Sequence, residues 1–208
     1  MKNRRACFAE RRPIYDMGPL PDLRELMRRA LSVNGEKPVL RETRDGEIVR
    51  YSCKNIIDDV NALGTALIDY GFADAHIALV GENSYLWLIS YMAVVCGVGV
   101  IVPLDKELTD GDLNMLALKG DARALIYAGP YRGAAGLLER ARVRGFAVEP
   151  LCGADDADTL PGMIRRGREL LGRGDRRYLD RPIDRDKAAA ILFTSGTTGA
   201  NKGVMLSH

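Results

Sequence analysis

The chain has 208 residues, of which 47% are hydrophobic and 28% are charged. This balance is typical of a globular protein and excludes a disordered, collagen-like or coiled-coil chain. The 30 basic and 28 acidic residues leave a net charge of +2, which is too small to indicate nucleic acid or an anionic membrane as the partner.

The first segment, residues 1–21, is predicted to be irregular. Basic residues crowd its beginning, but prolines follow where a secretory signal peptide would need an apolar stretch, so no export signal is indicated. Asp22, with Glu25 three residues later, then predicts the start of a helix that ends before Gly35. The apolar face of this helix comprises Leu23, Leu26, Met27, Ala30 and Leu31.

A hairpin and a second helix come next. Residues 39–42 and 47–51 are two short strand candidates on either side of an Arg-Asp-Gly turn, which indicates a β-hairpin. Ser52 is placed to cap the following helix, and Gly71 is placed to end it. The apolar residues between them follow the period of an amphipathic helix: Cys53, Ile56, Ile57, Val60, Leu63, Gly64 and Leu67.

Apolar strand candidates then alternate with helices in the middle of the chain. The strand candidates are residues 77–80, 98–102, 124–127 and 146–151. The helices between them begin near Ser84, Thr109 and Pro130. Strands that alternate with helices predict right-handed βαβ units and a parallel sheet. We therefore expect an α/β fold over residues 22–152, with a parallel sheet of βαβ units flanked by helices.

Residues 86–104 carry no charge and approach the roughly 20 residues that span a bilayer. Glycines and a proline interrupt the run, and its composition changes to a β-branched stretch at 98–102. A buried helix followed by a buried parallel strand explains this change, because both faces of such a strand are covered. We expect no membrane span here, and we expect Tyr85, Trp87 and Tyr91 in the core.

The last part of the chain has a different amino-acid composition from the middle. Residues 153–187 are rich in Asp, Arg and Gly and are interpreted as a surface connection with one helix near 160–171. Residues 188–208 are interpreted as a strand, a polar glycine loop and a strand of an incomplete second subdomain. Because such an isolated hairpin has unpaired edges, we expect a mobile loop and self-association through this edge.

The loop from Thr194 to Gly203 has the properties that a polyphosphate site needs. Its glycines let the backbone approach a ligand closely, its hydroxyls can donate to phosphate oxygens, and Lys202 supplies a positive charge. A P-loop NTPase motif is excluded, because that motif needs glycine at Asn201 and Ser or Thr at Gly203. No dinucleotide fingerprint is present. The alternative for this loop is a flexible turn between two strands.

The stretch LFTSGTTG at residues 192–199, followed by KGVMLSH at 202–208, resembles the signature loop of adenylate-forming enzymes. That family includes acyl-CoA synthetases, luciferases and the adenylation domains of peptide synthetases. Most members have proline before the lysine. This chain has Asn201 there, which is similar to the long-chain acyl-CoA synthetases. ENS at 82–84 and GVGVIVPL at 97–104 also resemble the family, so the likeness covers residues 20–208.

This resemblance implies a two-step reaction, in which ATP activates a carboxylic acid, here a fatty acid, as acyl-AMP and coenzyme A then displaces AMP. It implies that the loop holds the β- and γ-phosphates with Mg²⁺, that Lys202 is the catalytic cation, that the hydroxyls donate and that the glycines are hinges. The expected nucleotide-binding residues are Thr194, Ser195, Gly196, Thr197, Thr198, Gly199, Lys202 and Gly203.

The cysteines, the histidines and the length of the chain bear on its location, its metal content and its activity. The cysteines are scattered singly, which argues against a disulfide framework and favours a reducing cytoplasm. With two histidines, no transition-metal site is assigned. Because the family's adenine, ribose and magnesium residues lie downstream of the chain, the 208-residue form is expected to be inactive alone. The alternatives are an adenylating enzyme of acyl-carrier-protein or peptide-synthetase type, and a non-catalytic nucleotide-binding module.

Overall fold

A six-stranded sheet forms the centre of the computed structural model, which describes residues 18–149, 156–195 and 201–208. The strand order is β6-β5-β3-β4-β7-β8. The strands are β3 (His76–Val80), β4 (Val100–Pro103), β5 (Ala122–Tyr127), β6 (Arg144–Ala147), β7 (Ala188–Ser195) and β8 (Asn201–Ser207). Neighbouring strands are parallel except for β7 and β8, which are antiparallel. The predicted α/β fold with a mainly parallel sheet is confirmed.

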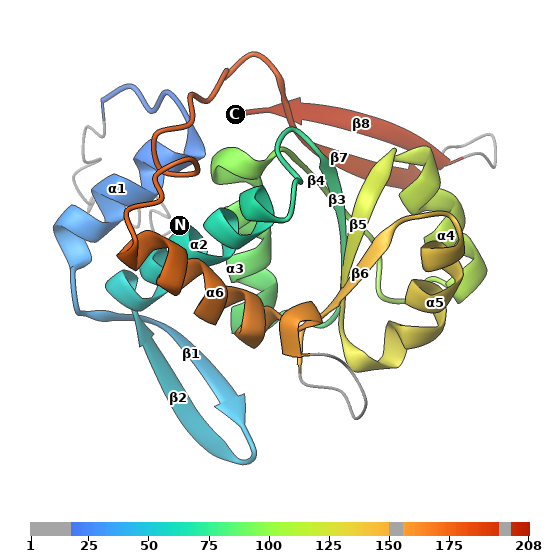
Figure 1. Ribbon diagram of the computed structural model, residues 1–208, viewed down its shortest axis with the longest axis horizontal. Helices are drawn as coiled ribbons and strands as arrows, with labels where there is room; N and C mark the ends of the chain where they lie inside the picture. Colours follow the sequence, from blue (N-terminus) through green and yellow to red (C-terminus); the bar gives the residue numbers. More distant parts are fainter. Residues whose placement is uncertain (1–17, 150–155, 196–200) are drawn as a thin grey trace, which may run out of the picture.

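Helices cover both faces of this sheet (Figure 1). One face carries α2 (Cys53–Asp69), α3 (Tyr85–Ala93) and α6 (Leu160–Gly172), with α1 (Leu23–Asn34) packed against α2. The other face carries α4 (Asp110–Lys119) and α5 (Arg132–Arg140). A hairpin of β1 (Pro38–Arg44) and β2 (Glu47–Ser52) projects from this body, as Figure 1 shows.

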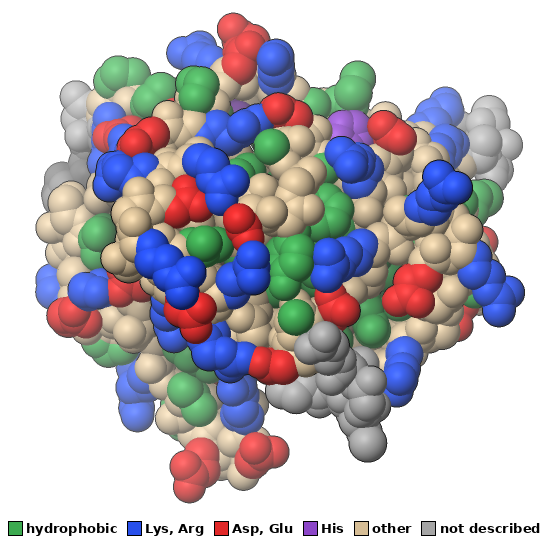
Figure 2. Space-filling view, viewed as in Figure 1, with side chains coloured by type: hydrophobic (Ala, Val, Ile, Leu, Met, Phe, Trp, Pro, Cys, Tyr) green, Lys and Arg blue, Asp and Glu red, His purple; other side chains and the backbone are tan. Residues whose placement is uncertain are grey.

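Two apolar cores lie on the two faces of the sheet. Alternate residues of a strand point to opposite faces, so that β3 contributes Ile77 and Leu79 to the first core and Ala78 and Val80 to the second. Because both faces are covered, the parallel strands read as continuous apolar runs in the sequence. Outside the cores, charged side chains of both signs are interspersed over the face drawn in Figure 2, in keeping with the small net charge.

Short polar side chains cap the helices where the sequence predicts it. Asp22 accepts a hydrogen bond from the backbone N–H of Glu25 at 2.8 Å. Ser52, the predicted cap of α2, makes the same kind of contact, and so do Ser84 and Thr109, near which α3 and α4 are predicted to begin. Gly35 and Gly71, with φ of 52° and 87°, follow the ends of α1 and α2. The apolar face of α1 is narrower than predicted, because Leu26 is 37% exposed.

Several strand boundaries differ from the prediction, and the differences are largest at β4 and β6. Val98, expected in a strand, ends a π-helical turn over Val94–Val98, and β4 begins at Val100. Gly97 in that turn has φ of 147°, a conformation that glycine adopts readily. The strand expected at 146–151 ends at Ala147, while residues 150 and 151 lie outside the described part of the chain. A buried apolar run has no period that separates helix from strand, which explains the error at Val98.

The uncharged run at 86–104 divides into α3, the π-helical turn and β4, which is the predicted order of a helix and a strand. Among the described helices, none is long and apolar enough to cross a membrane. Tyr85 is buried, and Trp87 and Tyr91 pack against the first core with their ring centroids 5.6 Å apart. The prediction that these rings belong to the core is confirmed.

The segment from 156 to 187 contributes more to the core than a surface connection does. Its predicted helix is present as α6, in which Leu160 and Met163 are fully buried. Tyr178, beyond α6, is 1% exposed and donates its hydroxyl to the carbonyl oxygen of Ala93 at 3.1 Å. The ring lies directly over Gly64 of α2, where a Cβ atom would collide with it. This segment therefore closes the first core.

The last two strands extend the central sheet. β7 pairs in parallel with β4, with Ile101 opposite Ala190, and β8 pairs with the other side of β7. β7 is thus paired on both sides, which differs from the expected isolated hairpin with two open edges. Among the described strands, β8 is the one at the end of the sheet, and its outer edge has no partner there.

Candidate functional site

β7 and β8 hold the two ends of the predicted phosphate loop. Thr194 lies opposite Lys202 in the antiparallel ladder, and Ser195 lies opposite Asn201. Residues directly opposite one another in such a ladder share a face of the sheet. Thr194 and Lys202 therefore lie side by side on one face, and both are exposed. This arrangement places a hydroxyl group and an ammonium group next to each other where the loop begins and ends.

The structure places part of the predicted site. Thr194, Ser195, Lys202 and Gly203 lie in described strands. The remaining predicted residues lie outside the described residues: Gly196, Thr197, Thr198 and Gly199. The described residues thus fix where the loop begins and ends, and the roles of all eight residues in nucleotide binding stay predictions.

Gly203 has a packing role beside its predicted role as a hinge, which stays a prediction. It is not among the described glycines with positive φ. A Cβ atom at this position would lie 3.2 Å from Cγ2 of Ile191 and 3.3 Å from Cε1 of Phe193. Glycine at 203 therefore lets the side chains of β7 pack against the backbone of β8, which keeps the two loop ends in register.

The loop leaves the sheet at the edge where the parallel strands have their carboxyl ends, because β7 runs parallel to β4. Ligands of open α/β sheets bind outside this edge, at the point where the connections of neighbouring strands diverge to opposite faces. Here the chain after β3 leads to α3 on one face, and the chain after β4 leads to α4 on the other. The two connections therefore diverge between β3 and β4. β7 lies next to this point, because it is the neighbour of β4 on the other side.

Polar side chains occupy this point of divergence. Glu82 follows β3, and Lys106 follows β4. Nζ of Lys106 donates to both carboxylate oxygens of Glu82, at 2.9 and 2.8 Å. This hydrogen bond to the carboxylate raises the pKa of the Lys106 ammonium. Tyr131, after β5, donates its hydroxyl to the carbonyl oxygen of Lys106 at 3.0 Å. The three residues thus connect the ends of three neighbouring strands.

The sequence analysis did not assign Lys106. The signal that indicates it is its position, three residues after the end of a buried parallel strand, where polar residues meet at the binding edge. A second cation was also missed. Nζ of Lys119, the last residue of α4, donates to the carbonyl oxygen of Asn201 and so connects α4 to the start of β8.

In the described part of the chain, no group of three or more His, Cys, Asp or Glu that could hold a metal ion occurs. The groups next to the loop are hydroxyl and backbone oxygens, a donor type that Mg²⁺ accepts. Thr194 is one such hydroxyl, and it is exposed.

Comparison with known proteins identifies the family. A family model described as AMP-binding enzyme matches residues 27–208. The chain belongs to the AMP-binding enzyme family. Long-chain-fatty-acid–CoA ligase 5 of Rattus norvegicus is 26% identical over 99% of this chain and 32% of its own length. The chain therefore spans about a third of the length of this relative.

Solved structures show the same fold. The A-PCP didomain of a carboxylic acid reductase from Segniliparus rugosus, in complex with AMP, has a TM-score of 0.75 and 20% identity over 93% of this chain and 32% of that one. A long-chain-fatty-acid-CoA ligase from Archaeoglobus fulgidus has a TM-score of 0.73 and 20% identity over 91% of this chain and 37% of that one. These structures thus share the fold of the chain.

Proposed function

We propose that this chain forms the phosphate-binding part of an ATP-dependent acid–thiol ligase. The ligase would activate a carboxylic acid as acyl-AMP and transfer the acyl group to coenzyme A. One observation carries the proposal: a loop of hydroxyls and glycines begins and ends on paired strands at the carboxyl edge of a parallel sheet, with Lys202 opposite Thr194.

The chemistry explains why the site needs these groups. A carboxylate is a poor electrophile, so its oxygen attacks the α-phosphate of ATP, and pyrophosphate leaves. Negative charge then develops on the β- and γ-phosphates. The Lys202 ammonium and the hydroxyls of Thr194, Ser195, Thr197 and Thr198 are the proposed donors to that charge. Mg²⁺ that entered with the nucleotide would supply further positive charge. Glycines in the loop are proposed to let backbone N–H groups approach the phosphates.

The fatty acid is proposed from the relatives, among which long-chain-fatty-acid–CoA ligases recur. The acceptor is proposed as coenzyme A on the same ground. A carrier-protein acceptor is the alternative, because the matching A-PCP didomain joins an adenylation domain to a further domain. Cys53 and Cys96 are free and buried, which fits the proposed cytoplasmic location.

We further propose that the 208 residues alone do not catalyse adenylation. A test compares the chain with a protein that carries it together with the further sequence present in its relatives. Fatty-acid-dependent ATP–pyrophosphate exchange is expected from the longer protein and not from the chain. Exchange by the pure 208-residue chain would show that it holds the complete site. Mg-ATP binding without exchange in the longer protein would instead favour the non-catalytic nucleotide-binding module.

A further inference from the structure

Helix α1 contributes no buried residue to the molecule, so its attachment depends on polar contacts. Leu23 and Met27 pack against the first core from its surface. The side chain of Arg24 instead reaches the π-helical turn before β4, where a Cβ atom on Gly97 would lie 2.3 Å from Nη2 of Arg24. Glycine at 97 therefore leaves the space that the guanidinium occupies.

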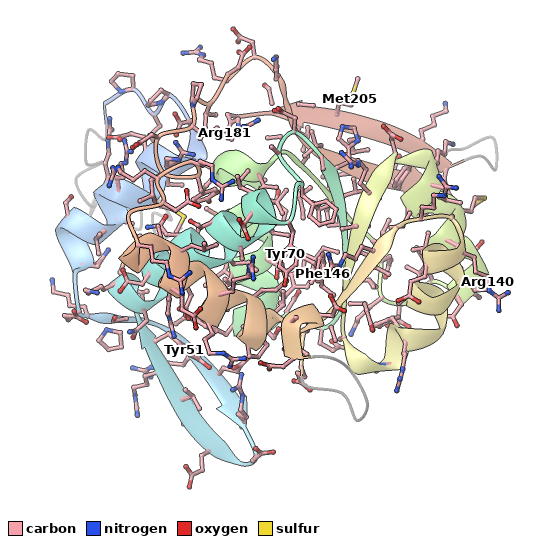
Figure 3. The ribbon with its side chains drawn as sticks, viewed as in Figure 1. Tyr51, Tyr70, Arg140, Phe146, Arg181 and Met205 are labelled. Atoms are coloured by element: carbon pink, nitrogen blue, oxygen red, sulfur yellow. The ribbon has the colours of Figure 1, made fainter. Side chains whose placement is uncertain are left out.

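The Arg24 guanidinium binds backbone carbonyl groups of two separate segments. Nε donates to the carbonyl oxygen of Cys96 in the π-helical turn at 2.8 Å. Nη1 donates to the carbonyl oxygens of Arg181 at 2.6 Å and Leu179 at 3.3 Å, and Nη2 donates to that of Tyr178 at 3.0 Å. Hydrogen bonds from a charged donor are strong. This side chain thus joins α1 to the segment that leads to β7, in which Figure 3 labels Arg181.

The residue after β8 also contacts α1. Nδ1 of His208 accepts a hydrogen bond from the backbone N–H of Leu23, the first residue of α1, at 3.4 Å. Burial lowers the pKa of the His208 imidazole, so the ring is neutral at pH 7 and its Nδ1 can accept. The backbone N–H of His208 donates to the carbonyl oxygen of Arg185 at 3.3 Å. Both ends of the β7–β8 pair are therefore attached to α1 or to the segment that Arg24 binds.

The β7–β8 pair has less support from the sheet than the inner strands have. β7 and β4 have a single registered pair, Ile101 with Ala190, whereas β3 is paired with β5 over its whole length. The side chains that β7 buries include two small ones, Ala189 and Ala190. Parts of a protein with few buried apolar contacts open at a lower cost in free energy than its core. The attachments at the ends of this pair therefore matter for its order.

We propose that α1 is a latch on the β7–β8 pair, formed by its contacts with the segment before β7 and with His208. The helix and the two strands open and close together as one unit, while β3, β4, β5 and β6 stay folded. Every group of this latch lies in the described part of the chain, so the inference needs no further partner. It is also independent of the proposed ligase activity. Its consequence is that a helix near the beginning of the chain controls the position of the strands that carry Thr194 and Lys202.

Hydrogen exchange followed by mass spectrometry tests the latch in the 208-residue chain, at a concentration where sedimentation velocity shows a monomer. Arg24→Met keeps an apolar stem and removes the guanidinium. Amides of α1, β7 and β8 are expected to exchange at least about tenfold faster in this variant, because several hydrogen bonds to a charged group are lost. Amides of β3 and β5 should exchange at the original rate. Arg28→Met, on the exposed side of the same helix, is the matched control and should leave β7 and β8 unchanged.

His208→Ala tests the latch from its other end, and it remains informative if Arg24→Met does not fold. Because coupling between two elements is reciprocal, this change after β8 should speed exchange in α1 as well as in β8. The increase should be about two- to tenfold, since one neutral hydrogen bond is lost. Unchanged exchange of α1 in His208→Ala would overturn the proposal. Faster exchange confined to α1 in Arg24→Met would also overturn it, and so would an equal increase in all strands, because α1 would then stabilise the whole chain.

Discussion

Lys202 has the properties expected of a residue that stabilises negative charge on the departing pyrophosphate. It is exposed, it lies opposite Thr194, and it forms no ion pair with a described residue. Lys106, near the same edge, is instead bound to Glu82. The two lysines therefore differ in their availability to a phosphate, and the difference favours Lys202 as the cation of the proposed reaction.

Lys202→Ala is expected to lower adenylation by roughly 10² to 10³ in the longer protein, the cost typical of losing one preorganised donor. Its effect on stability should be within about 0.5 kcal/mol, because the side chain is exposed. Fatty-acid-dependent ATP–pyrophosphate exchange measures the rate. Lys187→Ala, an exposed change just before β7, is the control. An undiminished rate in Lys202→Ala would remove the loop lysine from the mechanism.

Gly203→Val tests the packing role of glycine at the loop end. The added side chain would press on Ile191 and Phe193, and we expect destabilisation by about 1–3 kcal/mol, as for other overpacked sites. Urea denaturation of the chain measures the free energy of unfolding. Gly172→Ala, at the end of α6 with open space around it, should change this free energy little. Equal stability of Gly203→Val and the unmodified chain would argue for the hinge instead.

Among the helices and strands, the features that depend on a few neighbouring residues, such as helix caps, are predictable from the sequence. Ser52, Ser84 and Thr109 cap helices because a short side-chain oxygen satisfies a backbone N–H wherever the helix lies. Long-range packing decides the rest. The π-helical turn before β4 lies in an apolar run that has no informative period. Tyr178 lies in a polar segment, and nothing local indicates that its ring fills the space over Gly64.

Tyr178→Ala is expected to destabilise the chain by roughly 3–5 kcal/mol, because a large buried ring is removed from the first core. Tyr178→Phe keeps the ring and loses the hydrogen bond to Ala93, which should cost about 1 kcal/mol. Urea denaturation of the two variants separates the contributions. If Tyr178→Ala unfolds at the same urea concentration as the unmodified chain, the segment after α6 is a surface connection after all.

At the scale of the whole molecule, the two ends of the sheet differ. β6 ends one side and is short, whereas β8 ends the other with an open edge and three exposed apolar residues in a row: Val204, Met205 and Leu206. Figure 3 shows Met205 on this strand. The site edge was predictable in part, since the signature residues mark the loop. For Lys106 the sequence shows only a position after a buried strand, because the strand order is what places this strand beside β7.

This edge predicts self-association of the 208-residue chain. Sedimentation velocity is expected to show a species that grows with protein concentration. Met205→Lys should reduce it, because Met205 is 72% exposed and a lysine on an edge strand opposes pairing. Met115→Lys, on α4 and 49% exposed, is the matched control and should not. A monomer at all concentrations would show that the edge of β8 is protected.

The order of the strands also sets an order of assembly. β3 lies in the interior of the sheet, and β4 and β5 join its two sides through short βα connections. β7 joins β4 from 85 residues further along the chain, between Pro103 and Ala188, so its loop closure costs more entropy. During synthesis, the first four strands can pair before β7 leaves the ribosome. β7, which carries the start of the proposed phosphate loop, can then join these strands, which form a template that has already folded.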